Sequence, residues 1–170
     1  VEFYIQVLAD KTGSLIAAAA QVGVLFSGGP EELAEPLLAF GEKAGVAFQL
    51  LDDVIDLSAD PEATGKVPGT DLRAGVPTMP YLLLTRAGDD ASRELAATID
   101  RGVTEIAEGA DPAILDEPLA RLRDHDVTAQ TRRLAEKWAD DAVAALAPLP
   151  SGAVRDALTR FAEVVVDRAS

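Results

Sequence analysis

The residues best able to do chemistry are acids on an otherwise apolar stretch, residues 48–56. At about 100° of rotation per residue, a helix places Gln49, Asp52, Asp53 and Asp56 within an arc of roughly 100°. The remaining positions of this stretch are apolar, so the helix is expected to be buried nearly all round. Carboxylates are almost never buried unless they are paired or bind a metal, and a cation is therefore the expected partner.

Magnesium is the cation that fits these ligands. Asp52 and Asp56 are four residues apart on one helix face, and Asp53 stands at the edge of the same face. Mg²⁺ takes one or two protein carboxylates and completes its shell with water and phosphate oxygens. The competing interpretation is a solvated row of acids near a helix C-terminus, where the helix dipole disfavours negative charge.

Two lysines are candidates for holding an anion. Lys66 follows Gly65 in a loop, and a flexible ammonium is a common point charge on phosphate, although a solvated lysine is the default there. Lys11 either pairs with Asp10 or faces an anionic ligand, and its spacing does not decide between the two. Thr12 could bond its own helix backbone and have no other role.

The elements that must position these residues are helices. Apolar residues at three- and four-residue spacing predict helices over residues 1–26, 31–57, 81–87, 90–108, 112–146 and 153–169. Pro36 leaves open a later start of the second helix, and the stretch 112–146 is compatible with two helices broken near His125. Residues 58–80 are rich in Pro and Gly, as functional or disordered loops are.

Composition limits the classes of function. The 170 residues are 48% hydrophobic and only 5% aromatic, which favours an all-α helical bundle. A net charge of -14 argues against a nucleic-acid partner. There is no cysteine, and the single histidine, His125, lies in a polar stretch and is predicted to be a surface residue.

Membrane and targeting signals are not visible in the sequence. The most apolar stretch, residues 15–26, is shorter than the roughly 20 residues of a membrane span. No secretory signal is recognisable, so we expect a cytoplasmic protein. The chain begins without methionine and in a helical pattern, which indicates a fragment.

Three motifs follow one another along the chain: Lys11-Thr12, then Phe48-Gln49-x-x-Asp52-Asp53-x-x-Asp56, then Gly65-Lys66-x-x-Gly69-x-Asp71-Leu72. In their order and separations they resemble the motifs of a known family, the trans-isoprenyl diphosphate synthases or polyprenyl synthetases. The resemblance continues through Leu149-Pro150-x-Gly152 to the last helix and so covers effectively the whole chain.

The resemblance implies an all-α helical bundle of the isoprenoid synthase type, with aspartates at the mouth of a deep central cavity. Residues 1–170 would be the C-terminal portion of a single polyprenyl synthetase domain. Such enzymes are Mg²⁺-dependent prenyltransferases that condense an allylic diphosphate with isopentenyl diphosphate to give a longer polyprenyl diphosphate. A homodimer and a peripheral membrane contact for product release are further expectations.

The resemblance also assigns roles to residues. Metal binding falls to three aspartates, of which the first contacts Mg²⁺ directly: Asp52, Asp53 and Asp56. The diphosphate oxygens are held by two lysines, Lys11 and Lys66. Thr12 and Gln49 lie near the reacting carbons, where they orient the diphosphate or stabilise cationic charge; with Lys11 they form the expected catalytic set.

Two departures from the family leave alternatives open. The family's first aspartate-rich motif and its arginine pair are absent from these residues, so the fragment alone is expected to be inactive. A non-catalytic partner subunit of such a synthase is therefore an alternative, and a class I terpene cyclase is a weaker one. Val76 stands where the family often has lysine, and Arg73 is the candidate substitute.

Overall fold

The computed structural model describes residues 1–58 and 67–167, and within these ranges it contains helices and connections but no strand. The prediction of an all-α fold is confirmed. The chain divides into two compact units. Unit 1 consists of Val1 and Asp52–Arg132, and unit 2 consists of Glu2–Leu51 and Arg133–Ser170.

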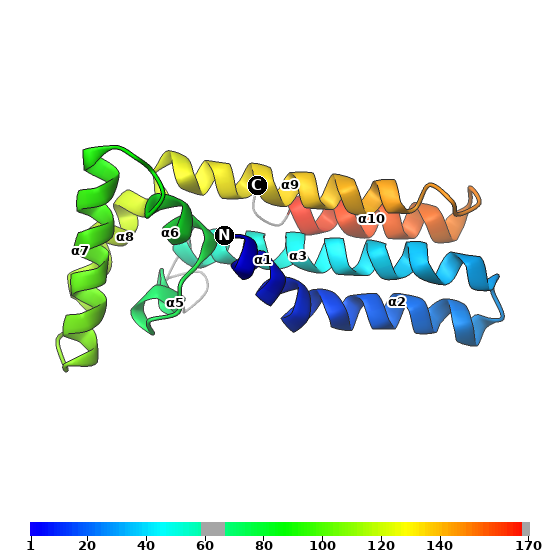
Figure 1. The fold of residues 1–170 in the computed structure, drawn as a ribbon, viewed down its shortest axis with the longest axis horizontal. Helices are drawn as coiled ribbons and strands as arrows, with labels where there is room; N and C mark the ends of the chain where they lie inside the picture. Colours follow the sequence, from blue (N-terminus) through cyan, green and yellow to red (C-terminus); the bar gives the residue numbers. More distant parts are fainter. Residues whose placement is uncertain (59–66, 168–170) are drawn as a thin grey trace. The chain divides into compact units, whose positions relative to one another are not determined.

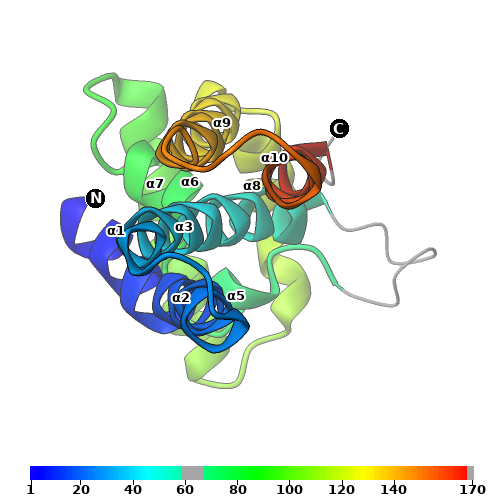
Figure 2. The same cartoon turned by 90° about the vertical axis from the view of Figure 1, so that its right-hand side faces the viewer.

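Unit 2 is a bundle of long helices that lie side by side (Figure 1) and are seen end on in Figure 2. Its elements are α1 (Glu2–Leu8), the π-helical turn η1 (Ala9–Gly13), α2 (Ser14–Ser27), the 3₁₀ turn η2 (Glu31–Leu33), most of α3 (Ala34–Ser58), most of α9 (Asp126–Ala145) and α10 (Ala153–Asp167). Phe40 of α3 is 2% exposed and its ring lies 6.4 Å from that of Phe161 on α10. Apolar residues of all four long helices share one core.

The ends of the unit 2 helices follow from their Gly and Pro residues. Gly28 ends α2 in the left-handed conformation, with φ of 74°, which glycine adopts without steric cost. Pro36 is the third residue of α3, where a helix needs no N–H from it, so α3 starts before this proline. The predicted helix 1–26 is nearly continuous, but its π-helical turn was not predicted.

Unit 1 contains shorter helices around a leucine-rich core. Its elements are the C-terminal end of α3, α5 (Thr70–Arg73), α6 (Met79–Leu84), α7 (Asp90–Ala107), the 3₁₀ turn η3 (Pro112–Leu115), α8 (Asp116–Arg123) and the start of α9. α7 contacts α5, α6, η3 and α8, and its place beside α8 can be followed in Figure 1. The core is made mainly by leucines, among them Leu57, Leu72, Leu84, Leu95, Leu115, Leu119 and Leu122.

Some predicted bounds in unit 1 were wrong. α6 starts at Met79 rather than Tyr81 and ends at Leu84, because Pro80 sits in its first turn, where proline is tolerated. The short helix α5 was not predicted. The suggested break of residues 112–146 near His125 is confirmed, because α8 ends at Arg123 and α9 begins at Asp126.

His125, which was predicted to be a surface residue, is only partly exposed. The side chain is partly buried, with Nε2 3.3 Å from the Ser92 hydroxyl. Its Nδ1 accepts the N–H of Val127 at 3.3 Å, so the ring caps the first turn of α9. The polar neighbours that motivated the prediction are themselves exposed, but the histidine between them turns toward α7.

No helix in residues 1–58 and 67–167 combines the length and the apolar character that a bilayer crossing needs.

Candidate functional site

The three predicted metal ligands share one helix but have different surroundings. All of them lie on the last turns of α3, in unit 1. Asp52 is exposed, Asp53 is 5% exposed and Asp56 is partly buried. The expectation of a uniformly buried row is therefore wrong for Asp52.

Asp53 fixes the start of α6. Its Oδ2 accepts the N–H of Met79, the first residue of that helix, at 2.8 Å. The preceding residue, Thr78, makes no capping bond with its side chain, and its buried hydroxyl has no hydrogen-bond partner. A carboxylate at a helix N-terminus bonds a free N–H and complements the helix dipole. Asp53 supplies this cap from a different helix.

Asp56 holds the start of α5 in a similar way. Its Oδ1 accepts the N–H of Thr70 at 3.2 Å, its Oδ2 accepts the N–H of Asp71 at 3.4 Å, and its main-chain oxygen accepts the N–H of Gly69 at 2.9 Å. Burial raises the pKa of Asp56 above its ordinary value, and the nearby carboxylates of Asp71 and Asp52 add to this. The two N–H bonds act in the opposite direction.

Asp52 differs from Asp53 and Asp56 because its carboxylate makes no hydrogen bond or ion pair with any residue that the structure describes. Within the described ranges, no three acidic, histidine or cysteine side chains are arranged as a metal cluster. The structure therefore does not bring Asp52, Asp53 and Asp56 together as a three-carboxylate site. The donor set still fits Mg²⁺, since one or two protein carboxylates are enough when water and phosphate complete the shell.

Arg73, the candidate substitute for a missing basic contact, is used inside the protein instead. Its side chain is 9% exposed. Nε donates to the carbonyl of Pro68 at 2.9 Å, Nη1 donates to the carbonyl of Pro112, and Nη2 pairs with Asp116 at 2.7 Å. The first bond joins the two ends of segment 68–73, and the other two connect Arg73 to η3 and α8.

Gly69 shows how closely this segment is packed. Its φ of 70° lies in the left-handed region, and a β-carbon added there would lie 2.4 Å from a methyl group of Leu119. Glycine is the residue that meets both demands. Segment 68–73, which follows the acids in the sequence, is thus held by the end of α3 on one side and by η3 and α8 on the other.

The remaining predicted residues lie in unit 2 or outside the described residues. Lys11 and Thr12 are on the π-helical turn η1, with Lys11 exposed and Thr12 partly buried. Asp10 accepts a bond from Gln6 at 2.9 Å, and Lys11 forms no ion pair with the carboxylates that the structure describes. Gln49 is partly buried on α3, and Lys66 lies outside the described residues.

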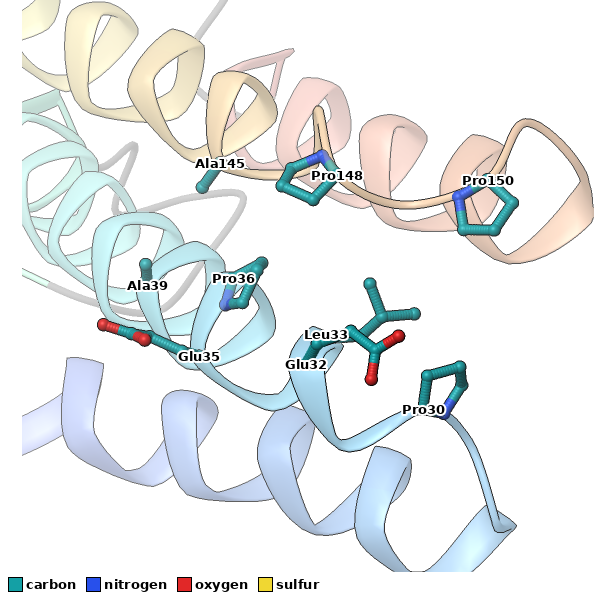
Figure 3. Close-up of a pocket in the computed structure, with 9 residues that line it drawn as sticks. All are labelled: Pro30, Glu32, Leu33, Glu35, Pro36, Ala39, Ala145, Pro148 and Pro150. Atoms are coloured by element: carbon teal, nitrogen blue, oxygen red, sulfur yellow. The ribbon is translucent and has the colours of Figure 1, made fainter.

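A pocket that is separate from the predicted site residues lies elsewhere in unit 2. It has a volume of about 580 Å³ and opens between the start of α3 and the connection from α9 to α10 (Figure 3). Four prolines and two glutamates contribute to its lining: Pro30, Pro36, Pro148, Pro150, Glu32 and Glu35. None of the predicted site residues lines this pocket, and none lines two other pockets of about 300 and 400 Å³ in the described residues.

The comparison with protein families decides what kind of protein carries this site. The family described as polyprenyl synthetase matches residues 1–111, well over half of the chain. The chain belongs to the polyprenyl synthetase family. The resemblance inferred from Lys11-Thr12 and the aspartate motif is therefore confirmed.

Characterised relatives of this polyprenyl synthetase chain are named as prenyl diphosphate synthases. A nonaprenyl diphosphate synthase of Mycobacterium tuberculosis is 38% identical over 99% of this chain and 48% of its own length. An octaprenyl diphosphate synthase of Escherichia coli is 35% identical over 98% of this chain and 50% of its own length. The chain thus spans about half the length of the curated relatives that it matches.

Solved structures of polyprenyl synthetases share the fold. A polyprenyl synthase of Caulobacter crescentus, complexed with calcium and isoprenyl diphosphate, is 30% identical with a TM-score of 0.84, over 98% of this chain and 49% of that one. A decaprenyl diphosphate synthase of Rhodobacter capsulatus is 31% identical with a TM-score of 0.80, over 99% of this chain and 50% of that one. The expected isoprenoid synthase type of bundle is confirmed.

Proposed function

We propose that this chain is the C-terminal portion of a single polyprenyl synthetase domain. The complete protein condenses an allylic diphosphate with isopentenyl diphosphate and releases a longer polyprenyl diphosphate. Membership of the family and the names of the relatives support this activity. Because the chain spans about half of those relatives, we also propose that the 170 residues alone are inactive.

The observation that carries the proposal is the difference in exposure and hydrogen bonding among the carboxylates of the three aspartates. Asp53 and Asp56 are occupied by backbone N–H groups, whereas Asp52 is exposed and makes no bond with the described residues. We assign the direct contact with Mg²⁺ to Asp52. Asp56 keeps further lone pairs on both oxygens and assists through water. Bound Mg²⁺ would neutralise negative charge on the diphosphate leaving group.

The chain's own cations and polar groups hold the substrate. Lys11 is exposed, and no described carboxylate competes for its ammonium, which leaves it able to bind diphosphate oxygens. We propose the same role for Lys66 on the basis of its motif. Thr12 and Gln49, both partly buried, orient the diphosphate beside the reacting carbon.

The reaction has two physical requirements. Breaking the allylic C–O bond sends the electron pair to the diphosphate, whose added charge is best stabilised by fixed positive groups in a dry site. The carbon that loses the diphosphate becomes cationic, and apolar walls must exclude water from it until the double bond of isopentenyl diphosphate attacks. A helical bundle with few polar core residues suits the second requirement.

The experiment uses the intact protein with an allylic diphosphate, labelled isopentenyl diphosphate and Mg²⁺. We expect labelled polyprenyl diphosphates of increased chain length. Asp52→Ala should reduce turnover by orders of magnitude while helicity by circular dichroism stays unchanged. Near-normal turnover of this variant would refute the metal role, and cyclic hydrocarbon products would favour a terpene cyclase instead.

The partner-subunit alternative is motivated by one observation, that the family's first aspartate-rich motif is not among these residues. An Asp-Asp-x-x-Asp motif upstream in the same open reading frame would exclude it. From the family resemblance we further propose that the complete enzyme is a cytoplasmic homodimer, which sedimentation of the purified protein and cell fractionation can test.

A further inference from the structure

Lys11 and Thr12 lie on an unusual piece of backbone. Residues Ala9–Gly13 form a π-helical turn between the regular helices α1 and α2, with the N–H of Ser14 bonded to the carbonyl of Ala9. Such turns are rare and are found frequently at functional sites. The extra residue in the turn changes the direction of the side chains on it, so whatever holds the turn also aims Lys11 and Thr12.

The turn is held by backbone contact with α3. A β-carbon added to Gly45 would lie 2.6 Å from the Cα of Gly13, 2.9 Å from its nitrogen and 3.2 Å from the carbonyl carbon of Thr12. Real β-carbons do not approach backbone so closely, and these atoms cannot rotate away. From the opposite side, a β-carbon added to Gly13 would lie 2.9 Å from the carbonyl oxygen of Glu42.

A second contact of the same kind lies one turn of α3 away. A β-carbon added to Gly41 would lie 2.6 Å from the Cα of Ala17. The pairs Gly45 with Gly13 and Gly41 with Ala17 show that η1 and α2 run antiparallel to α3 along a line of small residues. Only the Gly45 pair touches the π-helical turn, because Ala17 is already inside the regular helix α2.

The spacing continues to Gln49, which is four residues beyond Gly45 on the same face of α3. The contact of Gly45 with Gly13 and Thr12 therefore sets the π-helical turn against α3, the helix that also carries Gln49, and all of these residues belong to unit 2.

We propose that Gly45 is a positioning residue of the diphosphate site: the absence of its side chain lets the π-helical turn lie directly on α3 and thereby aims Lys11 and Thr12. Gly45 touches no substrate. The inference rests on the proposed function, because it takes Lys11 and Thr12 as the groups that bind diphosphate.

The test compares Gly45→Ala with Gly41→Ala in the intact protein. Both variants add one methyl group at a 2.6 Å backbone contact, so we expect similar losses in the midpoint of urea unfolding. Gly45→Ala should also raise KM for the allylic diphosphate and weaken binding of inorganic diphosphate by about ten- to a hundredfold, since small misplacements are costly. Gly41→Ala should change both by much less.

Equal changes of KM and diphosphate affinity in the two variants would overturn the inference, because the role of Gly45 would then be purely structural. If Gly45→Ala does not fold, Gly13→Ala perturbs the packing of the same turn on α3 at a second point, the carbonyl oxygen of Glu42, and must show the same preferential loss. Lys11→Ala separates the two hypotheses. Unchanged diphosphate affinity in Lys11→Ala refutes the proposed role of Lys11. If Lys11→Ala weakens diphosphate binding but Gly45→Ala and Gly41→Ala change KM and diphosphate affinity equally, only the positioning role of Gly45 is refuted.

Discussion

The carboxylate of Asp53 on α3 accepts the main-chain N–H of Met79, 26 residues later in the chain, at 2.8 Å. A buried acid of the motif thus serves as the cap of another helix. Asp52, its immediate neighbour in sequence, is exposed and makes no bond with the described residues. Adjacent aspartates of one motif therefore have different surroundings, and we expect Asp53 to act in stability and Asp52 in ligand binding.

Removing the Asp53 carboxylate should destabilise the protein. Asp53→Ala leaves the Met79 N–H without its acceptor in a buried place, which costs about 1.5 to 3 kcal/mol for a bond to a charged group. Urea unfolding followed by circular dichroism measures the change. Asp52→Ala is the matched control and should stay within about 0.5 kcal/mol of the wild type. Equal losses in the two variants would contradict the capping role.

Arg73 should be more important for stability than its place at the end of the short helix α5 suggests. Arg73→Ala removes bonds to the carbonyls of Pro68 and Pro112 and the ion pair with Asp116, and we expect a loss of about 2 to 3 kcal/mol in unfolding free energy. Asp116→Asn should lose less than about 1 kcal/mol, because Asp116 is 67% exposed. A larger effect at Asp116 than at Arg73 would show that the carbonyl bonds contribute little.

Gly69→Ala should be costly for two reasons, backbone conformation and packing. The residue has a φ of 70°, and the added carbon would lie 2.4 Å from a methyl group of Leu119, which is itself 2% exposed. We expect a loss of about 2 to 4 kcal/mol by urea unfolding. Gly88→Ala has nothing within 4 Å of the added carbon and serves as the control. A Gly69 variant as stable as the Gly88 variant would show that the chain adjusts there.

Acid should weaken the start of α7. The Ser92 hydroxyl, at 2.6 Å, and the Ser92 N–H, at 2.8 Å, hold the pKa of Asp89 below its usual range. A depressed pKa stabilises the fold above the unfolded value of about 3.9, and this stabilisation disappears as pH falls through the folded value. The wild type should therefore lose its advantage over Asp89→Ala as pH drops below about 3.9. Urea midpoints that differ by a constant amount over that range would contradict this.

The all-α fold and the helix that carries the acidic motif could be predicted from the sequence, because apolar residues recur at helical spacing. The separate roles of Asp52 and Asp53 could not be predicted, since they depend on where α6 packs. The internal bonds of Arg73 could not be predicted, because two of its partners, Pro112 and Asp116, are distant in sequence. The π-helical turn was also missed, because one extra residue hardly disturbs the apolar pattern of α1 and α2.

The most direct test of the central claim is the Mg²⁺ concentration that gives half-maximal turnover in the intact protein. If Asp52 is the direct ligand, Asp52→Asn should raise that Mg²⁺ concentration by about a hundredfold. Changing a residue that only supports a metal ligand already weakens metal binding by about ten- to a hundredfold, so a direct ligand should reach the upper end of that range. Asp53→Asn should raise the Mg²⁺ concentration far less. A wild-type Mg²⁺ requirement in Asp52→Asn would contradict the account.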